Sequence, residues 1–239
     1  MGVYIFALLT IVLLYPLIGK RKSLIDGVLT KTNNLYYIVI ISTVLIVIAG
    51  FRDVTIGIDT LNYKNIFDFV NLYGFDKLLY QSTETGYTLF QILIGKAFGD
   101  FQMLLIISAF FYIGVISYLI FNYSKNPMIS YLLFIFFDFY TFSFSGIRQT
   151  LAITFILLAF IQIKNKKIFR FLVLVLVAST FHITALVFLP TYWLGKFKFS
   201  RKNLFFFFLC GLILFLTKDY FQMVMNNYAR ISYDAAETG

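Results

Sequence analysis

The stretch MISYLLFIFFDFYTFSFSGIRQTLAITFILLAFIQI, residues 128–163, decides the fold of this chain. Two strongly apolar runs flank a short polar segment, SGIRQTLA (145–152), which carries an arginine. Long apolar runs are typical of membrane helices, because a helix satisfies all its backbone hydrogen bonds internally where no water is present. The sequence therefore raises the question of what a guanidinium does between two candidate membrane segments.

The composition extends this reading to the whole chain. Apolar residues make up 60% of its 239 residues and charged residues only 13%, which exceeds what a soluble core needs. The formal net charge of +9 is concentrated in loops beside the apolar runs, which indicates membrane orientation and no nucleic-acid partner. We predict an all-α fold, a polytopic transmembrane helical bundle of about seven to nine segments, some re-entrant, forming one domain over 1–239.

Basic loops set the predicted orientation. Lysine and arginine collect in KRKSLIDGVLTK (20–31), KNKKIFR (164–170) and KFKFSRK (196–202), which we expect to face the cytoplasm. The amino terminus then lies outside, followed by an extracytoplasmic loop at about 52–86. The predicted apolar segments are 3–19, 35–51, 87–98, 102–121, 128–144, 149–163 and 169–195.

Two of these segments do not fit a simple crossing. The run 87–98 rises only about 18 Å against a hydrocarbon core of about 30 Å, so we predict an interfacial or re-entrant helix. The run 169–195 has basic residues at both ends, which favours a hairpin with His182 at its outward tip. A single tilted span is the alternative for this run. Broken helices at membrane depth usually line a cavity or are buried in protein, so the hairpin hints at a site near His182.

Polar residues that the apolar composition does not explain occur at four places. They are Arg52, Asp59 and Tyr63, then Glu84, then Arg148 and Gln149, and finally His182. The predicted topology places all of them on the outer side, where charge at membrane depth usually lines a polar cavity or is paired. A guanidinium fork suits phosphate oxygens, and histidine exchanges protons near neutral pH. The set therefore predicts a site for an anionic substrate.

Structural interpretations stand beside this one. Arg52 can be an interfacial residue that closes a span, and Arg148 can snorkel or pair with Asp138 of the preceding run. A solitary histidine in a helical turn often serves packing alone. The sequence contains no HExxH, paired CxxC, glycine-rich phosphate loop or GxSxG motif, so we predict no metal site and no cofactor.

Four motifs follow one another in a characteristic order. They are FRDVTIGIDTLNY (51–63), ETGYTLF (84–90), SGIRQTLA (145–152) and STFHITALVFLP (179–190). In this order they resemble the EpsG family of bacterial exopolysaccharide and capsule proteins, which are similar to Wzy-type polysaccharide polymerases. The resemblance runs from about residue 1 to 230. Proteins of this kind have further spans, so the resemblance leaves two alternatives: the chain is truncated at its carboxyl end, or the additional helices were never part of it.

The resemblance implies a GT-C-like glycosyltransferase of the bacterial cytoplasmic membrane, active on its extracytoplasmic face. It would join undecaprenyl-diphosphate-linked oligosaccharide repeat units during exopolysaccharide or capsule synthesis. On this basis Arg148 stabilises the departing diphosphate, with Arg52 as a second phosphate-binding residue. His182 is the preferred general base with Asp59 as its partner, although these two roles can be exchanged. Further candidate substrate contacts are Tyr63, Glu84 and Gln149.

Two other functions remain open from the sequence. A flippase or transporter for lipid-linked oligosaccharides would also bind diphosphate, but its charges should follow a lumen through both leaflets, whereas here they cluster on one side. A non-catalytic subunit of a polysaccharide assembly complex is the second alternative. Expected partners are the lipid-linked oligosaccharide, membrane lipid, and the flippase and chain-length regulator of the same pathway.

Overall fold

The computed structural model describes residues 2–18, 31–74, 84–194, 200–217 and 223. Within these ranges the regular elements are all helices, which confirms the predicted all-α class. The chain divides into two compact units, Met1–Tyr192 and Trp193–Gly239. The prediction of one domain over 1–239 stays a prediction, and we describe the two units separately.

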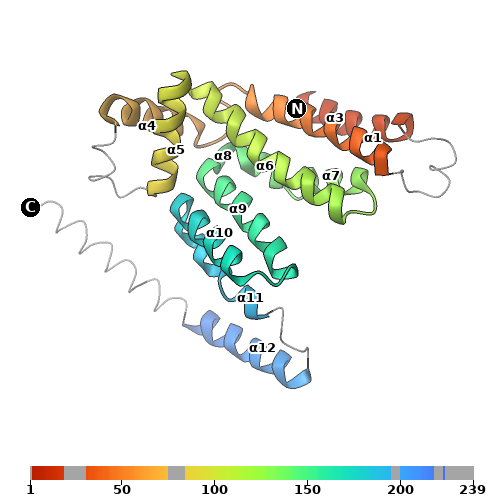
Figure 1. Cartoon of the computed structure of the whole chain (residues 1–239), viewed down its shortest axis with the longest axis vertical. Helices are drawn as coiled ribbons and strands as arrows, with labels where there is room; N and C mark the ends of the chain where they lie inside the picture. Colours follow the sequence, from red (N-terminus) through yellow and green to blue (C-terminus); the bar gives the residue numbers. More distant parts are fainter. Residues whose placement is uncertain (1, 19–30, 75–83, 195–199, 218–222, 224–239) are drawn as a thin grey trace, which may run out of the picture. The chain divides into compact units, whose positions relative to one another are not determined.

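The first unit contains the helices that matter for function (Figure 1). Their bounds are α1 Gly2–Ile18, α3 Lys31–Gly50, α4 Thr60–Tyr73, α5 Thr85–Phe98, α6 Phe101–Tyr123, α7 Pro127–Phe136, α8 Phe139–Ser145, α9 Ile147–Lys164, α10 Ile168–Phe181 and the 3-10 helix η2 Ile183–Phe188. The short helix α11, Thr191–Leu194, contains the boundary between the two units. The second unit contributes α12, Arg201–Leu216. The apolar runs predicted at 35–51, 102–121 and 149–163 thus form α3, α6 and α9.

Three helices are long and apolar enough to cross a membrane: Thr32–Gly50 in α3, then α6 and α9. Together α7 and α8 form a fourth candidate if this bent pair counts as one span. The apolar helices α1 and α10 fall below spanning length. The chain therefore has the helices of an integral membrane protein, while the predicted total of seven to nine membrane segments stays a prediction.

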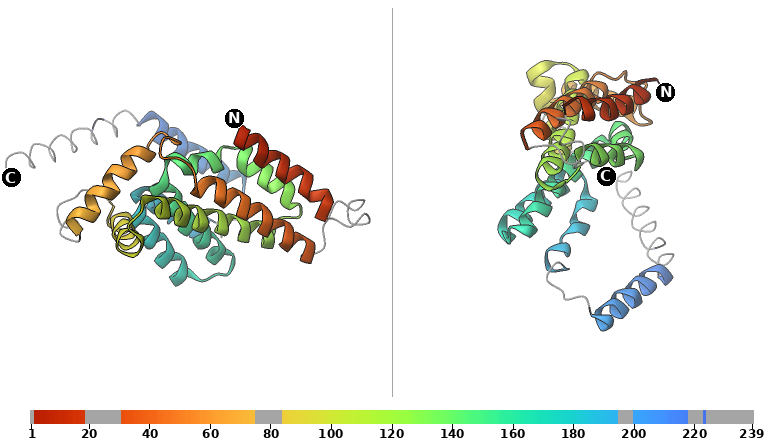
Figure 2. Two further views of the ribbon diagram at one scale, coloured as in Figure 1. Left: turned by 90° about the horizontal axis from the view of Figure 1, so that it is seen from above. Right: turned by 90° about the vertical axis from the view of Figure 1, so that its right-hand side faces the viewer.

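Five helices, α1, α3, α6, α7 and α8, contribute buried residues to the larger core. Helix α3 packs against both α1 and α6, and α1 also contacts α7 (Figure 2). Buried tyrosines fill this core, and their hydroxyls donate hydrogen bonds to backbone carbonyl oxygens of neighbouring helices. Tyr37 donates to the Ile11 carbonyl at 2.8 Å, and Tyr140 donates to the Leu45 carbonyl at 2.9 Å. These two hydroxyls are thereby satisfied, which offsets the cost of placing them inside the bundle.

The run predicted as one span at 128–144 is broken in the structure. Helices α7 and α8 meet at an angle of 47° across Phe137 and Asp138. Asp138 has a φ of 64°, in the left-handed region, so it cannot continue α7. Aspartate tolerates this conformation better than most residues, and the polar side chain interrupts the apolar run at the same point.

The segment after the basic turn at 164–170 is also interrupted, and the break falls at His182. Helix α10 ends at Phe181, His182 is extended with φ −159° and ψ 118°, and η2 begins at Ile183. Because η2 packs against α10, the chain doubles back here instead of forming one continuous helix. The structure therefore has the hairpin, and the tilted single span is not observed.

The segments predicted at 87–98 and 52–86 both contain helices in the structure. Helix α5 has 14 residues and a length of about 21 Å, too short to cross the hydrocarbon core. The predicted loop at 52–86 contains the helix α4, Thr60–Tyr73. The basic segments 20–31 and 196–202 lie largely outside the described residues, so the membrane orientation stays a prediction.

Candidate functional site

One carboxylate connects an arginine and the histidine across the first unit. Glu84 accepts a hydrogen bond from Arg148 Nη1 at Oε2, at 2.8 Å, and its Oε1 lies 2.7 Å from His182 Nδ1. Only 16% of the Glu84 side chain is exposed, compared with 34% for Arg148 and 26% for His182. We call these three residues the Glu84 cluster. It answers the question raised by the quoted turn, since Arg148 pairs with Glu84 and not with Asp138.

Three helix ends bring the cluster together. Glu84 immediately precedes α5, Arg148 lies in the first turn of α9, and His182 follows the last residue of α10. Each residue therefore sits at a backbone break, where its side chain can leave the helix surface. The pairs join residues that are 64 and 98 positions apart in the chain.

A close crossing of α5 and α10 fixes the distance between Glu84 and His182. A Cβ atom on Gly86 would lie 2.1 Å from Thr180 Oγ1 and 2.9 Å from the Thr180 carbonyl carbon. No side chain fits there unless the end of α10 moves. Two rings also pack against Phe181, the neighbour of His182: it stacks on Phe155 of α9 at a centroid distance of 5.3 Å and meets Phe90 of α5 edge-on at 6.3 Å.

We expect Gly86→Ala to lower the activity of the folded protein by at least about tenfold. The added methyl group must push Thr180 and the following His182 away from Glu84, and misplacement by about 1 Å can cost about 10²-fold in rate. Activity per folded molecule of the variant measures this effect. Gly114→Ala is the matched control, because a Cβ there meets nothing within 4 Å. Equal activity of both variants would show that the crossing does not position the cluster.

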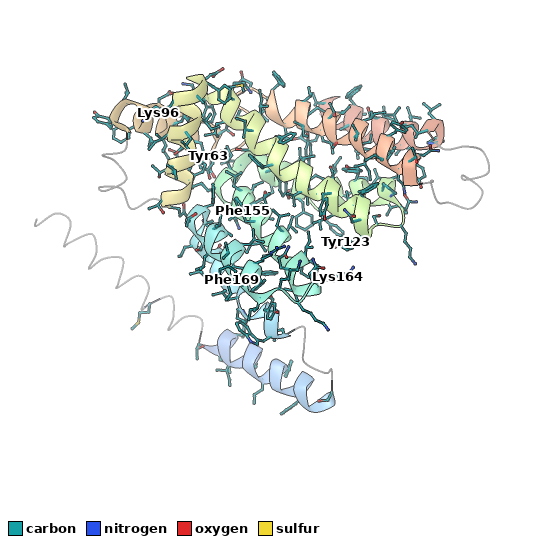
Figure 3. All side chains as sticks on the ribbon, viewed as in Figure 1. Tyr63, Lys96, Tyr123, Phe155, Lys164 and Phe169 are labelled. Atoms are coloured by element: carbon teal, nitrogen blue, oxygen red, sulfur yellow. The ribbon has the colours of Figure 1, made fainter. Side chains whose placement is uncertain are left out.

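Tyr63 and Gln149 border the cluster on different sides. Tyr63, from α4, is buried, and the Arg148 guanidinium carbon lies 5.7 Å from the centre of its ring (Figure 3). Gln149 and His182 line one mostly apolar cavity of about 340 Å³, between α9 and the segment after α10. The structure thus brings five of the seven predicted site residues together. Their roles in substrate binding stay predictions.

Arg52 lies elsewhere, inside the bundle. Its Nη1 donates to the Ala49 carbonyl, its Nη2 donates to the Phe144 carbonyl at 3.1 Å, and its guanidinium carbon lies 4.9 Å from the Phe144 ring centre. Burial lowers the pKa of Arg52 to about 10, so it still carries its charge at neutral pH. Arg52 ties the end of α3 to α8, and the structure does not place it with Arg148.

Asp59 is also separate from the cluster. It is exposed, occupies the position before α4, and makes no side-chain capping bond there. The carboxylate that contacts His182 is instead Glu84, which the sequence suggested only as a sugar contact. The signal was present in the motif ETGYTLF, but its distance from His182 along the chain concealed the pairing. Asp59 as base or partner of the histidine stays a prediction.

Sequence reasoning missed two buried polar side chains, Ser108 and Thr150, that lie beside Arg52. Ser108 Oγ, Thr150 Oγ1 and Arg52 Nε line an internal cavity of about 10 Å³, and none has a hydrogen-bond partner among the described residues. Serine and threonine are common in apolar runs, so no pattern set these two apart. Among the described residues, no three histidine, cysteine or acidic side chains group as metal ligands.

The cluster defines distinct chemical roles for its members. A carboxylate only accepts hydrogen bonds, so His182 Nδ1 is the donor and, in the neutral imidazole, Nε2 is left as an acceptor. Arg148 uses one of its five N–H donors for Glu84, and its side chain is about one-third exposed. Arginine forks bind phosphate oxygens in pairs. The site therefore places an imidazole nitrogen that can accept a proton near a guanidinium with N–H donors not used by Glu84.

Comparison with known proteins adds a family to this geometry. No curated protein and no solved structure gives a significant match to the chain. The sequence model of the EpsG family matches residues 35–239, which include the whole Glu84 cluster. The resemblance seen in the motifs is confirmed, and the chain belongs to the EpsG family.

Proposed function

We propose that this protein is a Wzy-like polysaccharide polymerase that joins undecaprenyl-diphosphate-linked oligosaccharide repeat units in exopolysaccharide or capsule synthesis. Family membership supports a role of this kind. The helices of membrane-spanning length suit a substrate carried on a lipid. We place the protein in the bacterial cytoplasmic membrane, with its active face outside.

The reaction is a glycosyl transfer between two lipid-linked saccharides. A hydroxyl oxygen of the acceptor sugar forms a bond to the anomeric carbon of the donor glycan, and the bond from that carbon to the diphosphate oxygen breaks. His182 Nε2 accepts the hydroxyl proton, which is general-base help worth about 10²–10⁴-fold. Arg148 binds the departing diphosphate, whose negative charge grows as the bond breaks. Glu84 keeps both residues in position and holds the histidine in the required tautomer.

The single observation that carries this proposal is the shared carboxylate. His182 Nδ1 and Arg148 Nη1 lie 2.7 and 2.8 Å from the two oxygens of Glu84, which supports their proposed roles as base and anion-binding group. Both groups would assist glycosyl transfer from a diphosphate carrier at one reacting centre, because proton removal and leaving-group charge develop together. A scaffold subunit would need neither.

Chain extension by the purified protein tests the proposal. The full chain in lipid nanodiscs is incubated with the lipid-linked repeat unit from the producing strain, and the products are resolved by length. A ladder of longer lipid-linked glycans supports the polymerase. Reorientation of the substrate in proteoliposomes without extension would identify a flippase, and neither result would identify an accessory subunit.

The active face is tested by cysteine labelling in intact cells. We expect a cysteine in place of Gln149 to react with a membrane-impermeant thiol reagent, because this exposed residue lies at the outer end of α9 in the predicted topology. A cysteine in place of Lys166, in the turn after α9, should be protected until the membrane is permeabilised. The native Cys210 is replaced by serine in all samples. The reverse pattern would place the Glu84 cluster on the cytoplasmic side.

A further inference from the structure

Asp138 is a charged residue for which the proposed reaction has no use. It interrupts an apolar run, where a carboxylate is costly unless it faces water, a partner or a ligand. The structure gives its side chain no hydrogen-bond or ion-pair partner among the described residues, and Arg148 pairs with Glu84 instead. Its left-handed backbone marks the bend between α7 and α8. Its side chain is exposed and so accessible to a ligand, and charged positions in broken membrane helices often belong to binding sites.

Asp138 lines a cavity of about 720 Å³, within the range typical of small-molecule sites. One wall comes from α8, a second from residues 55–58, and Tyr4 of α1 completes it. We call this cavity the Asp138 groove. Its polar lining consists of the Asp138 carboxylate and the hydroxyls of Tyr4, Thr55, Thr141 and Ser145, and its aromatic rings include Phe142, which is 37% exposed.

Hydrogen bonds fix the walls of the groove to each other. The Ile58 backbone N–H donates to Ser145 Oγ at 3.1 Å, and Thr60 Oγ1 donates to the Phe144 carbonyl at 3.0 Å. Gly57 has a φ of 102°, and a Cβ there would lie 2.5 Å from the Phe144 carbonyl oxygen. The loop therefore lies directly against α8, and the groove is a preformed feature of the fold.

The lining chemistry selects a class of ligand. No lysine or arginine lines the groove, so it is poorly suited to phosphate or another anion. A carboxylate and several hydroxyls accept hydrogen bonds from a ligand rich in hydroxyl groups, and bonds to the charged acceptor are the stronger ones. Tyr4 and Phe142 offer apolar ring surface for the carbon face of a sugar. We infer that the Asp138 groove binds the saccharide portion of a glycan.

The groove lies beside the Glu84 cluster in the chain. Ser145 ends α8 in the groove wall, and Arg148 follows in the first turn of α9. A glycan in the groove and a diphosphate at Arg148 would occupy the two sides of the α8–α9 junction. The identity of this glycan, the substrate or product of the polymerase, rests on the proposed function, whereas the saccharide class rests on the groove lining.

Binding of free oligosaccharides tests the inference without requiring catalysis. The probes are oligosaccharides of one to three repeat units, released by mild acid from the exopolysaccharide of the producing strain. Their Kd for the full chain in lipid nanodiscs is measured by titration calorimetry. We expect Asp138→Asn to raise the Kd at least about tenfold, since asparagine adopts the left-handed conformation readily but lacks the charged acceptor. Tyr4→Ala, the second variant, should weaken binding through loss of the ring.

Two controls separate the groove from the reaction. Asp68→Asn removes another exposed carboxylate, paired only with Lys64, and should leave the Kd unchanged. Chain extension is measured on the same preparation: oligosaccharide binding without chain extension by the unaltered protein would contradict the polymerase proposal alone, so its failure is seen separately from a failure of the groove. The inference is overturned if Asp138→Asn and Tyr4→Ala both bind within twofold of the unaltered chain. It is equally overturned if the unaltered chain binds no oligosaccharide. Tighter binding of the polycation spermine than of the oligosaccharides would also overturn it, because the carboxylate would then serve a cationic ligand.

Discussion

Replacing Arg148 by lysine should lower polymer formation per folded molecule by at least about 10²-fold, nearly as much as replacing it by alanine. Removing one well-placed donor to a developing negative charge costs about 10²–10³-fold in turnover. Lysine keeps a positive charge that can pair with Glu84, but it lacks the planar fork that holds two phosphate oxygens and Glu84 at once. It also loses the guanidinium face that lies 5.7 Å from the Tyr63 ring centre.

The measurement is chain extension from a defined lipid-linked repeat unit, divided by the amount of monodisperse protein. Arg170→Lys is the matched control, because Arg170 is exposed on α10 and takes no part in the Glu84 cluster. It should polymerise normally. Full activity of Arg148→Lys would mean that any cation serves at this position. It would contradict the proposal that the guanidinium fork of Arg148 recognises the diphosphate.

The second large effect is expected for Glu84→Gln, which keeps the size of the side chain and removes its charge. The amide oxygen can still accept a bond from one neighbour, but the amide nitrogen is a donor and faces a donor on the other. Either Arg148 or His182 therefore loses its support. We expect turnover to fall by about 10²–10⁴-fold, the range that general-base help contributes, while the protein stays folded.

Asp68→Asn is the control for this substitution. It makes the same chemical change at an exposed residue whose bond to Lys64 spans 2.7 Å. Exposed pairs of this kind contribute about 0.3–0.5 kcal/mol, so neither activity nor folding should change measurably. A Glu84→Gln variant that extends chains at the unaltered rate would show that the cluster is structural and would return attention to Asp59 as a base.

The length of the apolar runs alone predicted the three longest helices of the fold. The runs at 35–51, 102–121 and 149–163 appear as α3, α6 and α9, because many consecutive apolar residues leave the backbone no other way to satisfy its hydrogen bonds in lipid. The bend at Asp138 was not predicted. It depends on the backbone angle of one residue, which composition does not encode, although the lone carboxylate in FIFFDFYTF marked its position.

The candidate site was predicted as a set of residues but not as an arrangement. Arg148, Glu84 and His182 were identified because ionisable side chains are rare in this apolar chain and are costly at membrane depth unless they are paired or bind a ligand. Which of them touch depends on how α5, α9 and α10 pack, and a single sequence carries little information about contacts between residues so far apart. The same limit applies to Arg52: its motif suggested a place beside Arg148, whereas packing holds it inside the bundle.

Side chains at both ends of helix α9 contact different neighbouring elements. Arg148, in the first turn of α9, forms an ion pair with Glu84, which precedes α5. Lys164 is the last residue of α9, and its Nζ lies 4.2 Å from the centre of the Tyr123 ring at the end of α6 (Figure 3). Between these points α9 packs against α6 and α10. Alternating access in a transporter requires one group of helices to rock past another around the bound substrate. Both contacts would have to break before α9 could slide or tilt, which favours the stationary site of the proposed polymerase over a transporter.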